Sequence, residues 1–170
     1  LHVKKNGKLP SNETITETVK KCKNANWLGL ILACVSPEII ANSINEVKKL
    51  NISFGYKANL WKSEEPVPVH KMASPEDKIQ ANPIETLGTR YDFNGKKFLE
   101  FSKKMMNKGA TILGGCCETF PSHINEITKL RHYYERRLAK VNGRTGVGLS
   151  GIDQRKFRKV VRFLNKCRKG

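Results

Sequence analysis

The sequence predicts an α/β fold built around a parallel sheet. A short, continuously apolar run occurs at 27–34, further strand-like runs occur at 52–56 and 110–113, and helical patterns with one apolar face lie before, between and after these runs. A continuous apolar run is typical of a strand that is covered on both faces. The resulting order of helix, strand, helix, strand, helix, strand, helix is typical of right-handed βαβ units.

The first two helices have recognisable starts. The first follows Ser11 or Asn12, either of which can cap it, and its apolar side chains recur on one face (Ile15, Val19 and Cys22). After the first strand, Ser36 is the predicted N-cap of the second helix. Pro37 then stands at the first helical position, and Glu38 favours the helix dipole. Three side chains are expected on the inner face of this helix (Ile40, Ile44 and Val47).

The second strand leads into a long connection over 60–94 that contains four prolines. Loops of this length are usually functional or disordered. A third helix is predicted over 95–107, with Gly109 as its stop and three large apolar side chains inward (Phe98, Phe101 and Met105). The last strand ends in the sequence GGCC at 114–117, and a further helix opens with Pro121 in its first turn.

The charge of the chain is unevenly distributed. The net charge is +17, and residues 132–170 contain 12 Lys and Arg against 2 Asp and Glu. We therefore divide the chain into a domain over 1–131 and a basic tail over 132–170. No apolar run approaches the ~20 residues of a membrane span. The five cysteines, an odd number without regular spacing, argue against a secreted disulfide scaffold. We expect a cytoplasmic chain with reduced thiols.

Three cysteines follow predicted strands. Cys34 ends the first strand, and Cys116 and Cys117 end the last. Because chemistry in parallel α/β folds lies at the carboxyl ends of the strands, these thiols are expected to converge, with Asn59 on the same side. Three thiolates with one position left open form the coordination pattern of a catalytic zinc site. The two glycines before Cys116 are expected to let the backbone turn sharply and approach closely. The alternative is that the cysteines are simply buried in the core.

Three segments resemble the homocysteine S-methyltransferase family. GATILGGCCETFPSHINEI (109–127) is similar to the last strand and helix of that family, and its GGCC element is specific. LGLILACVSPEIIANSI (28–44) is similar to the earlier segment that supplies the other zinc ligand, and FGYKAN (54–59) to the strand between them. The resemblance covers roughly 1–131. Among the subgroups, the sequence CVSPE is more similar to enzymes that use S-methylmethionine or S-adenosylmethionine than to those that use betaine.

The resemblance implies a partial (β/α)8 TIM-type barrel, made of about four C-terminal β/α units and followed by the basic helical tail. It implies Zn²⁺ held by Cys34, Cys116 and Cys117, which binds the homocysteine thiol for methylation by a sulfonium donor, giving methionine. It also implies that the Asn59 oxygen occupies the open position or contacts the substrate. Ala33 departs from the family, which usually has Asn there.

Only half of the barrel is represented, because a closed barrel typically needs about 250 residues. An active chain and one impaired by truncation both stay open. A half barrel also exposes two sheet edges, which favours self-association.

Several other patterns have weaker interpretations. The sequence at 146–151 spells G-x-G-x-x-G, but no strand clearly precedes it, so a flexible linker is the default. The basic amphipathic pattern over 152–170 supports an alternative function: a non-catalytic fragment whose tail binds RNA or an anionic surface. Cys167 lies among these cations. We expect His123 to be near the site without binding metal, and His70 has no assigned role.

Overall fold

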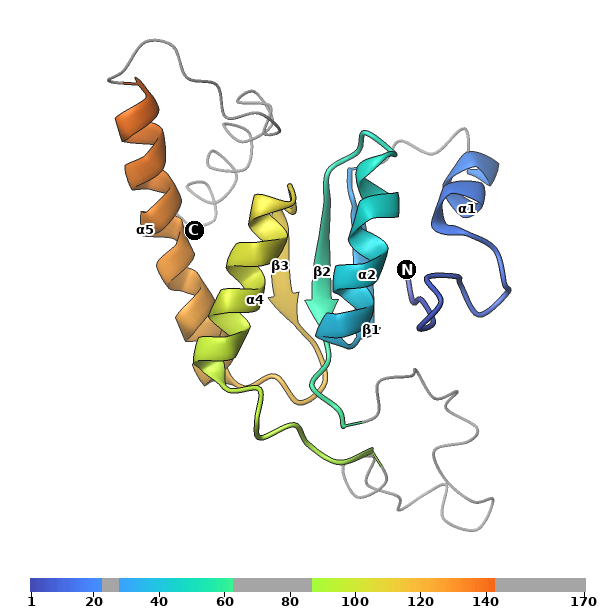
Figure 1. The fold of residues 1–170 in the computed structure, drawn as a ribbon, viewed down its shortest axis with the longest axis horizontal. Coiled ribbons are helices and arrows are strands. Elements are labelled where there is room, and N and C mark those ends of the chain that lie inside the picture. Colours follow the sequence, from blue (N-terminus) through green and yellow to red (C-terminus); the bar gives the residue numbers. More distant parts are fainter. Residues whose placement is uncertain (23–27, 63–86, 143–170) are drawn as a thin grey trace, which may run out of the picture.

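The computed structural model describes residues 1–22, 28–62 and 87–142, and for 132–142 it describes the backbone alone. The described residues form four helices and three strands in the predicted order (Figure 1): α1 (Ile15–Lys21), β1 (Leu30–Val35), α2 (Pro37–Lys48), β2 (Phe54–Ala58), α4 (Gly95–Asn107), β3 (Ile112–Gly115) and α5 (Pro121–Asn142). The predicted α/β class is therefore confirmed. His70, the sequence at 146–151, the tail helix and Cys167 lie outside the described residues.

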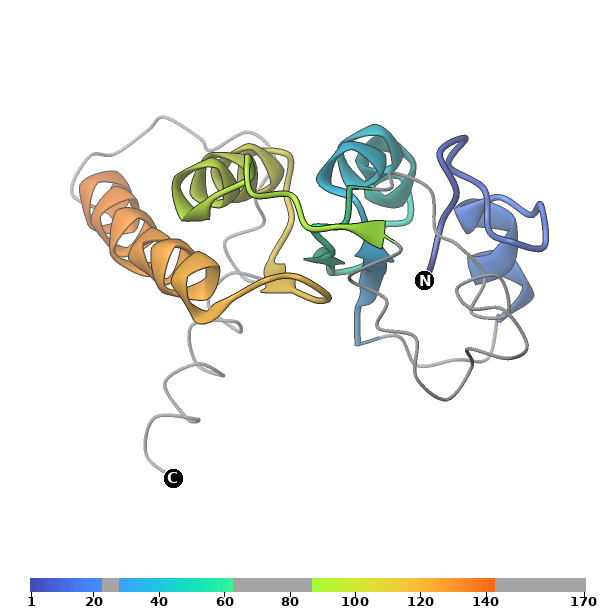
Figure 2. The same ribbon diagram turned by 90° about the horizontal axis from the view of Figure 1, so that it is seen from below.

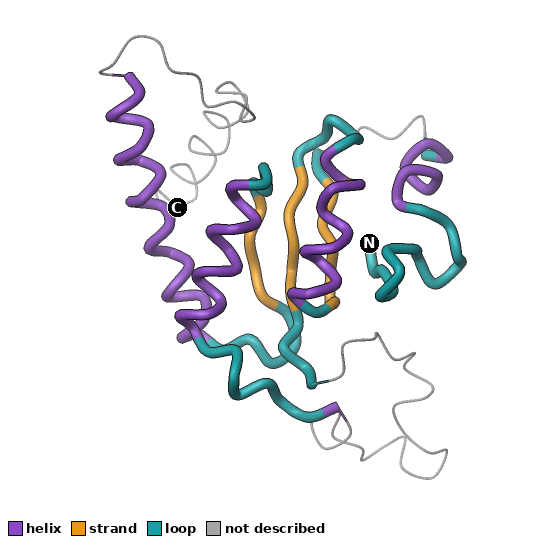
Figure 3. Tube along the Cα trace, in the orientation of Figure 1, coloured by secondary structure: helices purple, strands orange, loops and turns teal. Residues whose placement is uncertain are grey.

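The three strands form one parallel sheet in the order β1-β2-β3. The register pairs Leu32 with Tyr56 and Tyr56 with Leu113, so β2 is the central strand. Helices α2 and α4 lie side by side over one face of this sheet, with α5 beyond α4 and α1 beyond α2 (Figures 2 and 3). All three strands therefore end at the same edge of the sheet.

The core lies between the sheet and these helices. Tyr56 of β2 contacts the rings of Phe98 and Phe101 of α4 edge-on, with ring centroids 6.4 and 5.0 Å apart. The inward side chains predicted for α2 are buried, as are Phe98 and Met105 of α4, while Phe101 is half-buried. Adjacent side chains of a strand point to opposite faces. The contacts of Tyr56 therefore identify the helix-covered face of each strand.

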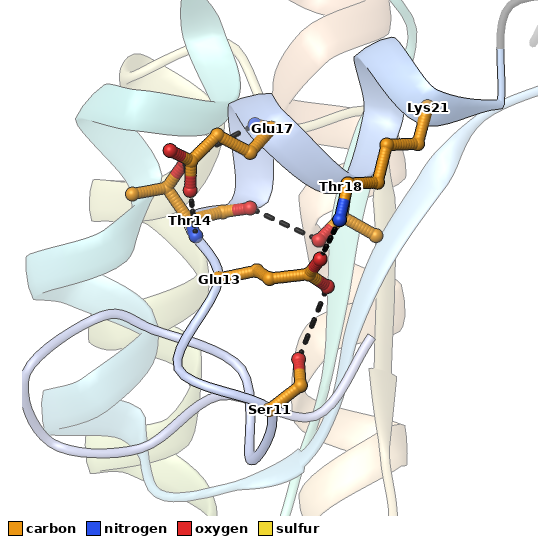
Figure 4. A network of polar contacts seen from close by, with 6 residues as sticks. All are labelled: Ser11, Glu13, Thr14, Glu17, Thr18 and Lys21. Carbon is orange, nitrogen blue, oxygen red and sulfur yellow. Dashed lines mark hydrogen bonds and ion pairs between the residues drawn. The ribbon is translucent and has the colours of Figure 1, made fainter.

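The start of α1 differs from the prediction. Thr14 is the N-cap, not Ser11 or Asn12, because Glu17 stands three residues after it and completes a capping box. The Thr14 side chain accepts from the Glu17 amide, and the Glu17 carboxylate accepts from the Thr14 amide (Figure 4). At the other end Cys22 is the C-cap and is exposed, so its place on the buried face was wrongly predicted.

The other helix boundaries follow the sequence. The Ser36 hydroxyl accepts from the Ile39 amide at 3.3 Å, and Pro37 opens α2 as predicted. Asn94 caps α4, and Gly109 follows its C-terminus with φ 106°, which is the predicted stop. Of the helices described, none is both long enough and apolar enough to cross a membrane.

Candidate metal centre

The three predicted cysteines come together at the carboxyl edge of the sheet. The Cys34 and Cys117 sulfur atoms are 3.7 Å apart, and the Cys116 and Cys117 sulfur atoms are 3.9 Å apart. All three sulfur atoms lie within 4.8 Å of one another, and each residue is half-buried. Within the described residues this is the one group of three or more His, Cys, Asp or Glu that could hold a metal ion. The predicted convergence of these thiols agrees with this geometry.

Cys34 reaches the cluster through an irregularity in β1. The pairing with β2 shifts between Ala33 and Val35, and Cys34 has the left-handed φ of 57°. Such a conformation costs a non-glycine residue about 1–3 kcal/mol, so the surroundings must hold it. The Asn59 amide donates to the Val35 carbonyl at 3.0 Å, and the Asn59 side chain donates to the Cys34 carbonyl at 2.8 Å. The bulge is therefore stabilised from the end of β2.

The two glycines before Cys116 have different roles. Neither has a positive φ, and the left-handed residue of this segment is Glu118, with φ 58°. A Cβ on Gly115 would lie 2.6 Å from the Cβ of Thr119, whereas one on Gly114 would meet nothing closer than 3.7 Å. Gly115 is thus required for a close approach of the backbone, and Gly114 is not.

The electrostatics of the cluster favour a neutral Cys34 thiol while no cation is bound. Burial, together with the neighbouring thiols of Cys116 and Cys117, raises the pKa of the Cys34 thiol to about 12. The charged form is disfavoured because it loses solvation and because adjacent thiolates would repel one another. A cation reverses both effects. Three close thiols are therefore suited to a thiophilic metal, which binds them as thiolates.

Asn59 lies beside the cluster but is engaged elsewhere. Its side chain is buried, and its amide nitrogen donates to the Cys34 carbonyl. Its side-chain oxygen accepts only a long hydrogen bond, 3.4 Å, from the Trp61 amide. The structure thus places Asn59 next to the bulge of β1, and its role at the open position stays a prediction.

His123 lies in the first turn of α5 and is buried. Its Nδ1 accepts from the Phe120 amide at 2.9 Å, so its Nε2 carries the proton and donates to the Phe93 carbonyl at 3.0 Å. Both ring nitrogens are used in joining the start of α5 to the segment before α4. His123 therefore supports the local structure and does not belong to the group of cysteines.

The sequence interpretation missed a set of residues that contact the segments bearing the cysteines. The Thr89 hydroxyl donates to the Glu118 carboxylate at 2.6 Å, and the Arg90 guanidinium donates to Glu38 at 2.7 Å. Glu38 was noted only for the helix dipole. Thr89 and Arg90 carry no local sequence signal, because the residues that they contact lie far from them in the sequence.

Comparisons with known proteins agree with the geometry. Residues 1–131 match the sequence model of a protein family described as homocysteine S-methyltransferase. The chain is also 25% identical, over 127 residues, to the protein named Homocysteine S-methyltransferase 1 from Arabidopsis thaliana. That alignment covers 72% of this chain and 33% of the relative, so the chain spans about a third of the length of the curated protein it matches. Among solved structures there is no significant match.

Proposed function

The chain belongs to the homocysteine S-methyltransferase family, and on that premise we propose that it transfers a methyl group to the thiol of homocysteine, giving methionine. The proposed donor is a sulfonium compound, S-methylmethionine or S-adenosylmethionine. The observation that carries the proposal is the convergence of Cys34, Cys116 and Cys117 at the carboxyl edge of the sheet.

The spacing of the sulfur atoms fits zinc. Tetrahedral Zn²⁺ with bonds of about 2.3 Å to sulfur places its ligands about 3.8 Å apart. The separations of the Cys117 sulfur from those of Cys34 and Cys116, 3.7 and 3.9 Å, lie close to that value. Cys34, Cys116 and Cys117 would therefore hold the ion and leave one position for the substrate sulfur. When bound, the ion supplies charge that removes the proton from a coordinated thiol.

The reaction has a simple balance of bonds. The deprotonated homocysteine sulfur attacks the methyl carbon of the donor, and a new sulfur–carbon bond forms. The bond from that carbon to the donor sulfonium breaks, and its electron pair stays on the donor sulfur, which becomes a neutral thioether. The thiolate is the nucleophile because a neutral thiol is far less reactive. The Asn59 oxygen, which holds only its long hydrogen bond from Trp61, is the proposed neighbour of the open position.

The proposed architecture is the C-terminal half of a (β/α)8 barrel over 1–131, with a basic tail over 132–170. In its support, the strands are parallel, α2 and α4 lie on one face, and the cysteines stand at the carboxyl ends. Helix α5 runs across residue 131, so the boundary between domain and tail stays a proposal. Binding of RNA or an anionic surface by the tail concerns residues outside the described ranges and also stays a prediction.

Zinc content tests the proposal directly. We expect about one zinc per chain after purification under reducing conditions. The zinc should be lost from Cys34→Ser and Cys117→Ser and retained by Cys22→Ser, whose exposed thiol is a matched control. Methyl transfer to homocysteine is then assayed with S-methylmethionine and with S-adenosylmethionine in turn. Folded wild-type protein that binds no zinc, or variants that bind as much as the wild type, would contradict the proposal.

A further inference from the structure

The thiols of Cys34 and Cys117 come from strands that are not neighbours. Cys34 lies in the bulge of β1, Cys117 follows β3, and β2 lies between these strands. The last register pairs of the sheet are Val35 with Ala58 and Ala58 with Gly115. Cys34 lies before the last pair, and the Cys116 amide still donates to the Ala58 carbonyl at 2.7 Å, whereas Cys117 lies beyond the paired residues. Contacts from outside the ladder can therefore add to those that hold the two segments at their observed separation.

A short segment, residues 88–90, crosses this edge of the sheet, and we call it the brace. Its backbone is joined to 60–62, the continuation of β2. The Lys62 amide donates to the Gly88 carbonyl at 2.9 Å, and the Arg90 amide donates to the Leu60 carbonyl at 2.9 Å. The Leu60 amide in turn donates to the Cys117 carbonyl at 3.0 Å. The backbone of the brace is thus one residue removed from the cysteine pair.

The first side chain of the brace reaches the segment after Cys117. Thr89 is only 5% exposed, and its hydroxyl donates to the Glu118 carboxylate at 2.6 Å. Glu118 is the left-handed residue of this segment, with φ 58°. A left-handed glutamate persists only where its surroundings fix it. The hydrogen bond from Thr89 is the side-chain contact that does so.

The second side chain of the brace reaches the segment after Cys34. The Arg90 guanidinium donates to Glu38 at 2.7 Å, and Glu38 is in the first turn of α2, four residues after Cys34. The Arg90 side chain is only 18% exposed and lies 4.9 Å from the centroid of the Phe93 ring. The second carboxylate oxygen of Glu38 is buried without a hydrogen-bond partner. Arg90 is therefore the ion-pair partner of this carboxylate among the described residues.

We propose that the brace sets the spacing of the cysteine sulfurs, with Thr89 and Arg90 as positioning residues. Thr89 fixes the segment after β3 through Glu118, and Arg90 fixes the segment after β1 through Glu38. Its importance for metal binding rests on the proposed function. The inference that the brace sets the sulfur spacing does not rest on the proposed function, because this spacing is measurable without metal.

Two measurements on the full chain test the brace. The first is zinc affinity, obtained by competition with a chromophoric chelator. The second is the rate at which Cys34 and Cys117 form a disulfide in metal-free Cys116→Ser protein, with glutathione disulfide as the oxidant that is reduced. Peptide mass spectrometry identifies the bond. We expect Thr89→Val and Arg90→Met to weaken zinc binding by about tenfold, as is typical when partners of metal ligands are removed, and to slow cross-linking.

Matched variants separate positioning from a general loss of structure. Thr89→Ser retains the hydroxyl and should restore both properties. Thr111→Val removes a threonine hydroxyl that donates to the Phe54 carbonyl at the other end of the sheet. Asp92→Asn removes the other carboxylate partner of Arg90, 3.3 Å away. Neither control should change zinc affinity or cross-linking. Should Arg90→Met fail to fold, Glu118→Ala, which removes the acceptor of the Thr89 hydroxyl, tests the same brace from the Thr89 side.

The outcomes are distinct. Zinc affinity and cross-linking rates equal to wild type in Thr89→Val and Arg90→Met would overturn the brace and leave the proposed function standing. A wild-type chain that binds no zinc, combined with slower cross-linking in the brace variants, would overturn the proposed function and support the brace. Weaker zinc binding in the brace variants, restored by Thr89→Ser, supports both.

Discussion

Each of the two segments that form the sulfur cluster contains a left-handed residue: Cys34, with φ 57°, and Glu118, with φ 58°. Each costs about 1–3 kcal/mol relative to an ordinary backbone conformation. Each is also hydrogen-bonded from another segment: the Asn59 side chain donates to the Cys34 carbonyl, and the Thr89 hydroxyl donates to the Glu118 carboxylate. Strained residues with such support are common at functional sites, which is consistent with the proposed metal centre.

Gly115 gives a test at the level of one atom. In Gly115→Ala the new methyl group would lie 2.6 Å from Thr119 Cβ and 2.8 Å from Thr119 Cγ2, so the segment after Cys116 must move. We expect stability to fall by about 1–3 kcal/mol, as for other overpacked sites, and zinc affinity to fall with it. Urea unfolding and chelator competition measure the two effects.

Gly114→Ala is the matched control for this prediction, because its methyl group would meet only ordinary contacts of 3.7 and 4.0 Å. The same glycine-to-alanine change is then made one residue away without a clash. Equal losses in both variants would show that the GGCC segment is sensitive to any added side chain, and the close approach at Gly115 would not be the reason.

At this scale the sequence indicated which cysteines converge but not how the backbone bends. The prediction for Cys34, Cys116 and Cys117 needed only strand ends, which apolar runs reveal. The bend depends on φ values that residue type does not dictate here: Glu118 is left-handed although glutamate rarely is, and Gly115 is not left-handed although glycine readily is. Contacts beyond the neighbouring residue contribute to these conformations, those of Gly115 with Thr119 and of Glu118 with the distant Thr89.

Among the elements, β2 and α4 are joined by a buried polar contact within the aromatic cluster. The Ser102 hydroxyl donates to the Phe98 carbonyl at 2.7 Å, so the Tyr56 hydroxyl donates to Ser102 at 2.6 Å. The apolar periodicity of 95–107 predicted which face of α4 turns inward, and the core confirms it. The cap of α1 was wrongly predicted because Ser11 and Asn12 are also common capping residues. Of the three candidates only Thr14 has a glutamate three residues later, Glu17, which completes a capping box.

The contact between β2 and α4 predicts a dependence of stability on pH. Burial raises the pKa of Tyr56 from 10.0 to about 12. The folded state therefore holds this proton more tightly than the unfolded state does, and the contribution is present below about pH 10 and lost as the pH rises toward 12. We expect the free energy of unfolding to decline over that interval less steeply in Tyr56→Phe than in the wild type. Urea unfolding at a series of pH values measures it.

The control for this prediction is Tyr91→Phe, which removes a tyrosine hydroxyl from a side chain that is 82% exposed. The pH dependence of Tyr91→Phe should follow that of the wild type. If Tyr56→Phe also follows the wild type between pH 10 and 12, burial of the Tyr56 hydroxyl does not contribute to stability in the way we infer.

For the whole molecule, the sequence predicted the alternation of helices and strands and the edge at which the site lies. It did not predict the brace, because no periodic pattern connects 88–90 to the ends of β1 and β3. The residues that the brace contacts lie far from it in the sequence. The proposals that concern the barrel and the basic tail extend beyond the described residues. They rest on the resemblance and on the distribution of charge.

The sheet predicts self-association of this chain. Helices α2 and α4 cover one face, and among the described helices none lies across the other (Figure 2). Parallel sheets are normally covered on both faces. Ile31, which alternates with the buried Leu30 and Leu32, lies on the uncovered face. A second copy can cover this face, so we expect sedimentation velocity to show a mass that rises with protein concentration.

Ile31→Lys should shift the chain toward the monomer, because a buried ammonium is costly. Ile124→Lys, at a side chain of α5 that is 38% exposed, is the control and should not. A single monomeric mass at every concentration would show that the face is covered within one chain.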